Sequence, residues 1–551
     1  MSKSQNKSRN NGKVNQKNGK SDNNNSRGRD SRNNSKSDRR DSNSKYQDAD
    51  TRYVGANRGP NEISWWNKSS ALYNEATKIS FMNQLGAQVH IPGVKFNPNT
   101  PDQYVPGGLV MDTITCPGYS SDITSPASIA AVGVYEEIRK RLNKPNPDYE
   151  PADLAIMIYC ISDLYSQYMN IVRAFGCVNL WSSSNLYLPR SFMQALYGGK
   201  NVDTILRELQ NSGPQLRFRF NSMIAEANSF LTMPANLDLI TRHSWLFQFL
   251  YMDSHSNKAQ LFARRKAVAY AWDETGSTGS KAKCIPMDKE VYRDVNVMSS
   301  MIALFGECLE LLRNSSSVRI MISDMRQAFG DSLHYEMPIL DEMYTTELRD
   351  IDEVNMQIEN TIIMPVDPVL SSTPGSLDVT QDPETGAIIY QPIAAWDNTI
   401  PNDLIQQWYV DGNYVLNIHE RDITPEMIME ASRSMPTIDS ASPAAKTMVF
   451  RPCTDFCSGI RLVYSPLQPA TRLVWDGYIR GEEGEDVEPE TTNTMFYAAL
   501  SNFDWAPVLP GAFRYQDLDN YTVISKDQLE MLNQAALYSV WNIKEEGHYT
   551  I

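Results

Sequence analysis

The chain has 551 residues, with 51 Lys and Arg against 66 Asp and Glu, and a formal net charge of −15. Hydrophobic residues make up 41% and aromatic residues 10%, which excludes a wholly disordered or collagen-like chain. No run approaches the ~18 apolar residues of a membrane helix, and the N-terminus lacks the apolar segment of a secretory signal. The seven scattered cysteines indicate a reduced, intracellular setting.

The first 45 residues form a basic arm. They contain 13 Lys and Arg and 4 Asp, a net charge of +9, so the other 506 residues carry 38 basic and 62 acidic groups, a net charge of −24. Met1 and Val14 are the only apolar side chains of the arm. Burial therefore cannot offset the ~1–2 kcal/mol of backbone entropy lost per ordered residue. We predict that residues 1–50 are a disordered arm.

A flexible polycation binds nucleic-acid phosphates by releasing counterions, without choosing a sequence. No aromatic residue precedes Tyr46, which argues against base stacking by the arm. We therefore assign nucleic-acid contact to the cations of the arm, and the resemblance described below implies that this nucleic acid is RNA. The cations are Lys3, Lys7, Arg9, Lys13, Lys17, Lys20, Arg27, Arg29, Arg32, Lys36, Arg39, Arg40 and Lys45. The alternatives are a solubilising tail and a localisation signal.

After the arm, order is expected to begin near residues 62–85, which include Trp65 and Trp66. These two side chains either anchor the root of the arm on the body or a neighbouring subunit, or are ordinary core residues. Residues 90–124 are rich in Pro and Gly and are predicted to form an extended loop.

Helical patterns follow from residue 125. Ser125 and Pro126 predict a helix start, and Arg139–Arg141 suit its last turn. A second helix opens at Pro151 with apolar residues at three- and four-residue steps, and Gly176 is its predicted C-cap. Further helices are predicted at 190–197, 201–211, 214–231, 236–252, 293–313 and 318–329.

The pattern changes to strands after about residue 365. Turn signals in 380–392 and at Asp411-Gly412 predict hairpins, and 447–453, 459–466 and 471–481 alternate. Thr424-Pro425 predicts a short helix, and Ser525 with Gln528 predicts a capping box for a late one.

Motifs for chemistry are incomplete. Gly19-Lys20-Ser21 ends like a phosphate-binding loop, but Val14 occupies the position of its first glycine. The sequence has no Gly-x-Ser-x-Gly, no His-Glu-x-x-His and no Gly-Asp-Asp. The six histidines are scattered and are interpreted as hydrogen-bonded structural groups. We predict no enzyme activity and no cofactor.

Metal binding is also not predicted. Cys453 and Cys457 have no second pair of ligands, and His419 is the nearest histidine, so ordinary thiols are favoured over zinc. The acidic stretch 481–490 lacks the spacing of a calcium loop and is interpreted as a solvated loop.

The Ser/Asn/Lys/Arg arm that leads into Trp65-Trp66, the long helical body and the lack of a catalytic signature together resemble the capsid proteins of picobirnaviruses, the human virus type among them. The resemblance covers essentially the whole chain. It implies a predominantly helical α+β fold with a shell domain and a projecting domain. It further implies homodimers that tile a T=1 icosahedral shell around a double-stranded RNA genome.

From this resemblance we expect a virion protein that assembles in the host cytoplasm. Its expected partners are further copies of itself, RNA and an enclosed viral polymerase, with no membrane span. We assign residues 51–364 to the shell, 365–510 to a β-richer protruding region and 511–551 to a helix that returns to the shell. The middle of the helical half is the other candidate for the projection. The alternative functions are an RNA-coating nucleoprotein without a closed shell and a cytosolic enzyme with a targeting tail.

Overall fold

The structure is a computed structural model, and the chain divides into two compact units, Met1–Phe81 and Met82–Ile551. The described residues are 66–78, 107–143, 147–184, 189–198, 204–231, 237–255, 259–276, 279–330, 336–364, 366, 377–395, 412–419, 422–442, 447–464, 473–477, 500–508 and 520–543. The basic arm and its predicted RNA-contacting cations lie outside these ranges.

In the first unit the described residues form α2 (Ser70–Ala76), a short helix with no buried side chain. Trp66, just before this helix, is 72% exposed. Trp66 is therefore not a core residue of this unit, while Trp65 lies outside the described residues.

Helices make up most of the regular structure of the second unit. They are α3 (Pro126–Leu142), α4 (Pro151–Ser184), α5 (Pro189–Tyr197), α6 (Thr204–Phe230), α7 (Asp238–Trp245), α8 (Met287–Glu290), α9 (Val297–Asn314), α10 (Ser316–Phe329), α11 (Asp352–Asn360), α13 (Pro425–Ala431) and α15 (Lys526–Val540). Within the described part, none of them has the length and apolar composition needed to cross a bilayer. The predicted α+β class with mostly helices is confirmed.

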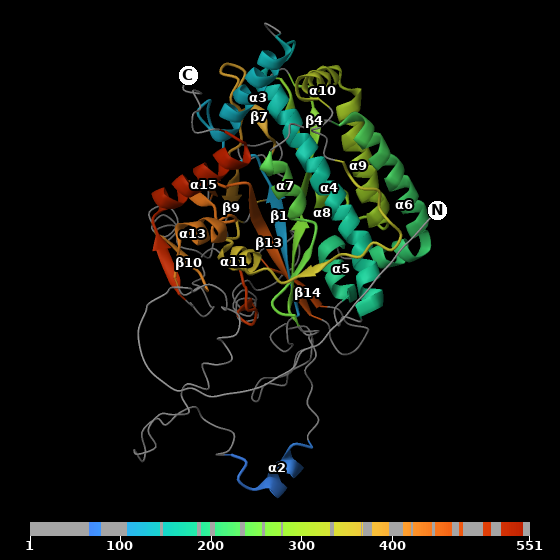
Figure 1. The fold of residues 1–551 in the computed structure, drawn as a ribbon, viewed down its shortest axis with the longest axis vertical. Helices are drawn as coiled ribbons and strands as arrows, with labels where there is room; N and C mark the ends of the chain where they lie inside the picture. The colour runs from blue at the N-terminus through green and yellow to red at the C-terminus, as the bar shows by residue number, and fades with distance from the viewer. Residues whose placement is uncertain are drawn as a thin grey trace, which may run out of the picture. The chain divides into compact units, whose positions relative to one another are not determined.

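One six-stranded sheet, ordered β14-β13-β1-β3-β2-β6, runs through the body (Figure 1). Its strands are β1 (Gly108–Thr115), β2 (Leu250–Met252), β3 (Leu261–Lys266), β6 (Leu348–Arg349), β13 (Asp455–Tyr464) and β14 (Leu473–Gly477). β1 pairs parallel with β3 and antiparallel with β13. Segments from both halves of the chain therefore meet at the centre of one sheet.

Smaller sheets surround this one. They are β4 (Val268–Asp273) with β5 (Lys281–Pro286), β7 (Thr380–Gln381) with β8 (Ile388–Ile389), β11 (Thr437–Ser442) with β12 (Thr447–Arg451) and β9 (Ile393–Ala395), and β10 (Tyr414–Asn417) with β15 (Tyr521–Ile524). The β7–β8 hairpin confirms the turn predicted within 380–392. The first arm of the hairpin predicted at Asp411-Gly412 lies outside the described residues.

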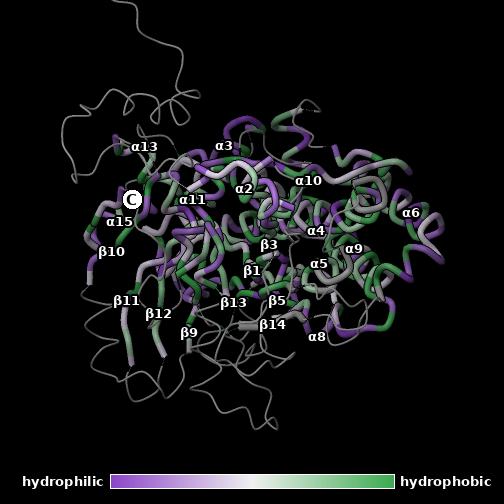
Figure 2. The backbone as a smooth tube through the Cα atoms, turned by 90° about the horizontal axis from the view of Figure 1, so that it is seen from below, coloured by the Kyte–Doolittle hydropathy of each residue, from purple (hydrophilic) through white to green (hydrophobic). Residues whose placement is uncertain are grey.

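Both faces of the central sheet are covered. Val110 and Ile114 of β1 belong to the main hydrophobic core, with α4 and α5, whereas Leu109 and Met111 pack in a second core with α11 and Phe503. Hydrophobic residues accordingly run through the middle of the body, and hydrophilic ones lie on peripheral helices such as α3 and α6 (Figure 2).

The prediction of a loop over 90–124 was wrong for 108–115, because this segment is β1 with all eight residues buried. A strand buried on both faces lacks the apolar–polar alternation by which a strand is usually recognised. The strands β3 and β4 were missed for the same reason, because β3 and most of β4 are buried without alternation. The strand β5 was also missed, although its burial does alternate.

Helix α4 confirms the strongest predicted helix, but Gly176 is not its C-cap, since the helix continues to Ser184. A Cβ atom on Gly176 would lie 2.2 Å from Oγ1 and 2.6 Å from the backbone nitrogen of Thr346. Gly176 is therefore required for the close approach of the 336–350 segment, not for a turn.

Two further helix boundaries differ from prediction. The segments 201–211 and 214–231 form a single helix, α6, with Pro214 inside it. The segment 236–252 splits into α7 and β2, because the chain turns after Trp245 and pairs with β3 and β6.

The predicted helix starts at Thr424 and Ser525 are confirmed. The hydroxyl of Thr424 accepts a hydrogen bond from the Met427 amide, and Ser525 and Gln528 form the complete capping box. Ser125 is the N-cap of α3 as predicted, although its side chain bonds the preceding turn instead of the helix.

Candidate functional site

Strand β3 carries three consecutive cations, Arg264, Arg265 and Lys266, and all three are buried. Burying an isolated charge costs several kcal/mol, so each cation needs an anionic partner inside the protein. The structure supplies a different acid for each. Together these ion pairs form a network that we call the β3 ionic core.

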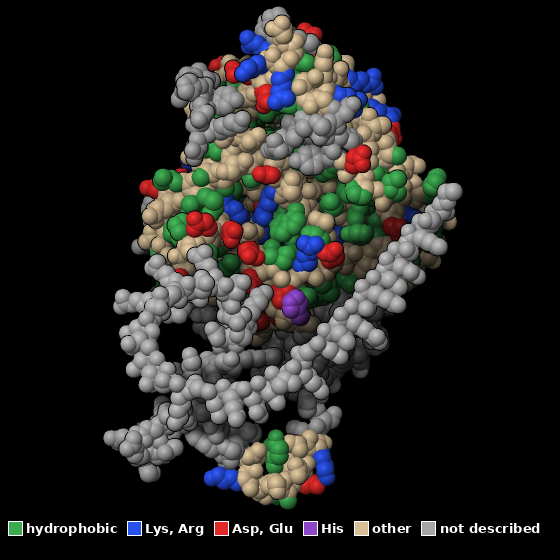
Figure 3. Space-filling view, viewed as in Figure 1, with side chains coloured by type: hydrophobic (Ala, Val, Ile, Leu, Met, Phe, Trp, Pro, Cys, Tyr) green, Lys and Arg blue, Asp and Glu red, His purple; other side chains and the backbone are tan. Residues whose placement is uncertain are grey.

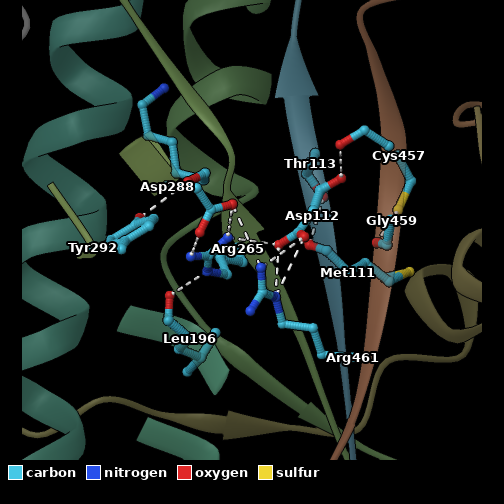
Figure 4. Close-up of polar contacts among 12 residues, drawn as sticks. Met111, Asp112, Thr113, Leu196, Arg265, Asp288, Tyr292, Cys457, Gly459 and Arg461 are labelled. Atoms are coloured by element: carbon cyan, nitrogen blue, oxygen red, sulfur yellow. Dashed lines mark hydrogen bonds and ion pairs between the residues drawn. The ribbon is translucent and has the colours of Figure 1, made fainter. Parts of the chain in front are cut away.

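Arg265 is clamped between two carboxylates (Figure 4). Its Nη1 lies 2.9 Å from Asp112 Oδ1 on β1, and its guanidinium forms two hydrogen bonds to Asp288 on α8. Its Nε donates to the carbonyl of Leu196 on α5 at 2.9 Å. Arg461 on β13 lies 3.3 Å from Asp112 Oδ2 and 3.5 Å from Asp288 Oδ2. The cluster holds two cations and two anions and ties three strands, β1, β3 and β13, to two helices, α5 and α8.

These contacts fix the charge states of the cluster. Burial alone would raise the pKa of Asp288, but the attraction of Arg265 and Arg461 outweighs it and holds the pKa well below its usual value. Burial would lower the pKa of Arg265, and the two carboxylates reverse this and raise it. Both groups therefore stay charged at any physiological pH.

Asp455, at the start of β13, is the partner of Arg264. Its carboxylate lies 3.5 Å from Arg264 and accepts two hydrogen bonds from Arg242 on α7, at 3.0 and 3.2 Å. Ser434 donates a further hydrogen bond at 2.7 Å. Burial would raise the pKa of Asp455, but Arg242 and Arg264 lower it well below its usual value.

Lys266 pairs with Asp163 in the middle of α4. Its Nζ lies 2.5 Å from Asp163 Oδ1 and 2.7 Å from Ser166 Oγ. Asp163 also accepts from the Tyr270 amide at 2.8 Å and from Gln167 at 2.9 Å. The longest helix is thereby fixed to both β3 and β4.

The β3 ionic core is suited to structural clamping and not to acid–base catalysis. Each of Asp112, Asp163 and Asp455 is almost fully buried and already faces a cation, so none of these carboxylates is within reach of a substrate from outside. Sequence reasoning missed this core. The available signal was charge inside apolar runs, as in 108–115 and 261–266.

A serine–histidine pair lies nearby. Nε2 of His243 faces the Thr454 carbonyl at 3.0 Å, and because a carbonyl only accepts, this nitrogen carries the proton. Nδ1 therefore accepts from Ser162 Oγ, also at 3.0 Å. Burial lowers the pKa of His243 to about 4. Ser162 and His243 are fully buried, so this histidine is a hydrogen-bonded structural group, as predicted.

The cysteines are also internal. All seven are buried and free, and burial raises the pKa of Cys177 and Cys308 to about 12. The Cys453 thiol contacts Arg433 and the Asn533 carbonyl, whereas the Cys457 thiol bonds the Gly459 carbonyl. Across the described ranges, no group of three or more potential ligands could hold a metal ion.

Basic side chains on the body surface gather near α3 and α10 (Figure 3). Several of them bond helix ends. Arg326 donates to the carbonyls of Ser229 and Phe230 at the end of α6, and Arg141 donates to the Ala328 carbonyl near the end of α10. Cations at helix C-termini are stabilising, so these residues have a structural role in the body.

Comparison with known proteins gives a consistent result. A family model described as the picobirnavirus capsid protein matches residues 65–457. The chain is 24% identical over 534 residues to a capsid protein precursor of human picobirnavirus, covering 88% of this chain and 92% of that protein. A crystal structure of the picobirnavirus capsid aligns with a TM-score of 0.65 at 20% identity, covering 87% of this chain and 98% of that one, which shows a shared fold.

Proposed function

Because the chain belongs to the picobirnavirus capsid protein family and is a structural virion protein, we propose that it assembles as homodimers into a closed T=1 icosahedral shell around a double-stranded RNA genome. We further propose that the basic arm, residues 1–45, contacts the RNA without sequence preference. Assembly in the host cytoplasm and enclosure of the viral polymerase are parts of the same proposal.

The observation that carries the role of the arm is the division of charge. The arm has a net charge of +9, while the remaining 506 residues have a net charge of −24. Phosphate contacts of single cations are weak, but arms confined inside one shell act together at high local concentration. An acidic body repels RNA and leaves the genome and polymerase mobile inside the shell.

The described body supports this division of charge between arm and body, because the buried cations of β3 are already paired with carboxylates of the same chain. Arg264, Arg265 and Lys266 are paired internally, and surface arginines such as Arg326 bond helix ends. An RNA-coating nucleoprotein needs a basic groove in its folded body. These internal contacts favour the shell over that alternative.

The proposed domain plan assigns residues 51–364 to the shell, 365–510 to the projection and 511–551 to a returning helix. Within 365–510, β13 and β14 pair in the central sheet, and Phe503 packs in its second core. We propose that the projection is built from the remaining part of that stretch.

Electron microscopy of the purified full chain tests the proposal. We expect closed particles of uniform diameter. RNA-dependent filaments would instead establish the nucleoprotein alternative, and a monomer under all assembly conditions would overturn the shell.

A further inference from the structure

The C-terminal elements β15 and α15 form a surface with unusual composition, at the side of the body where α15 and β10 lie (Figures 1 and 2). We call the exposed residues of these two elements the C-terminal face. They include Tyr521, Val523, Met531, Gln534 and Ala535. This face is not part of the β3 ionic core.

β15 is an edge strand. Its register pairs Tyr521–Ile524 with Asn417–Tyr414 of β10, and no other described strand lies on its second side. Tyr521 and Val523 point to one face of this small sheet and are 54% and 50% exposed. An exposed apolar edge strand is a template for pairing with another chain, and folded proteins normally block such an edge with charge or proline.

The exposed side of α15 is depleted of charge. Its exposed positions are Asp527, Gln528, Met531, Gln534, Ala535 and Ser539. Asp527 is in the first turn, where an acid stabilises the helix N-terminus. The rest are uncharged, and Met531 is 69% exposed.

The other charged residues of α15 are neutralised within the chain. Glu530 lies 3.8 Å from Lys526 and 3.7 Å from Arg451 of β12, and it also accepts from Thr437 at 3.2 Å. Lys526 and Glu530 are only 22% and 25% exposed. A surface helix normally presents its charges to water, whereas charge depletion is typical of the buried core of a protein interface.

We infer that the C-terminal face is a contact between two copies of this chain related by a two-fold axis, with the two β15 strands paired antiparallel. A strand edge is self-complementary in this arrangement, since each copy presents the same donors and acceptors in reverse order. The inference rests on the proposed shell function, which requires contacts between copies. A stable contact buries ~800 Å² per partner, so α15 contributes to it together with the four-residue strand.

Disulfide cross-linking tests this pairing directly. In an antiparallel pair of identical strands related by a two-fold axis, one residue lies directly opposite the same residue of the other copy, with both side chains on one face of the sheet. In the four-residue strand β15, the residue nearest the centre is Thr522 or Val523. Thr522→Cys and Val523→Cys are each introduced into the full chain, whose seven native thiols are all buried. Particles are then oxidised with copper–phenanthroline and analysed on non-reducing gels. One of the two variants should form a covalent dimer in high yield.

The matched control is Glu384→Cys, an exposed position in the β7–β8 turn, which should give little dimer. Particles that form normally but yield no dimer with Cys at 522 or 523 would overturn the contact and leave the shell intact. Equal cross-linking of the control would overturn it as well. Failure of the wild-type chain to form particles would count against the shell function itself.

A second variant tests whether the uncharged exposed side of α15 takes part in the contact between copies. Met531→Lys should weaken association between copies by at least about tenfold, because it buries an unpaired cation in the contact. Met343→Lys, at a residue that is 80% exposed on the 336–350 segment, is the control and should assemble like the wild type. Circular dichroism checks that both variants fold. Normal assembly of Met531→Lys, or an equal defect in the control, would contradict the inference.

Discussion

At the scale of single residues, Arg265 shows how much of the fold depends on internal charge pairs. It is fully buried and bonds Asp112, Asp288 and the Leu196 carbonyl. Arg265→Met should lower the free energy of unfolding by about 3–5 kcal/mol, because it leaves the buried Asp112 and the partly exposed Asp288 with Arg461 as their one remaining cation in the cluster. Urea unfolding followed by circular dichroism measures this loss. Lys289→Met is the control; its pair with Glu290 is at 4.0 Å and more than half exposed, so it should cost less than about 1 kcal/mol.

His243 makes stability depend on pH. Its pKa is lowered to about 4 in the folded protein, from an unfolded value near 6.5. Between these values the unfolded chain binds a proton that the folded chain does not, so the histidine makes the protein less stable as pH falls from 6.5 to 4. In His243→Gln the melting temperature should fall less steeply across this window than in the wild type. The 82% exposed His255 provides the control variant His255→Gln, which should keep the wild-type slope. Identical slopes for all three proteins would contradict the prediction.

The buried charges also mark the limit of sequence reasoning at this scale. Asp112 and Asp163 lie inside apolar segments, which signals an internal partner but does not identify it. The partners are far apart in the chain: Arg265 is 153 positions from Asp112, and Lys266 is 103 positions from Asp163. Only the sheet topology brings them together.

At the scale of elements, helices with local signals were predictable and doubly buried strands were not. The capping box at Ser525 and the cap at Thr424 are local hydrogen-bond patterns, so the sequence alone located both helix starts. β1 depends on β3 and β13, which follow it by more than a hundred residues, and its burial on both faces removes the alternation that identifies a strand.

Substitution by alanine should have opposite effects on stability at two glycines that lie inside helices, Gly176 in α4 and Gly306 in α9. Gly176→Ala should destabilise the protein, because its Cβ would overlap the Thr346 backbone at 2.6 Å. The loss should be about 1–3 kcal/mol, the usual cost of overpacking. Gly306→Ala meets only the flexible end of Met223, so it should be neutral or gain up to about 1 kcal/mol of helix propensity. Thermal melts of both variants measure the difference, and equal stability of the two would contradict the structural role of Gly176.

At the scale of the whole molecule, the arm and the body should be separable. Deletion of residues 1–45 should leave particles that assemble but contain far less RNA, because it removes all 13 cations of the arm. A variant with the arm sequence scrambled should package RNA normally, since phosphate contact does not depend on residue order. The ratio of absorbance at 260 and 280 nm in purified particles measures RNA content. Equal RNA content after deletion, at physiological salt, would contradict the role of the arm.

Salt provides an independent measure on the same scale. RNA binding by the intact chain should weaken with a log–log slope of several units, up to about 0.9 per phosphate contacted. Filter binding between low and moderate salt gives the slope for the full chain and for the deletion variant. The deletion variant should show a much smaller slope.

The pairing of β1 with β13 has a consequence for biosynthesis. Val463 of β13 is the partner of Gly108 of β1, so a ribosome has to add about 350 further residues after β1 before this pair can form. At ~5–20 residues per second this interval is roughly 20–70 s. During this time the apolar β1 segment of a nascent chain lacks its final neighbour. The central sheet therefore cannot be completed before β13 has been synthesised, so each polypeptide reaches its mature fold only when translation is nearly finished.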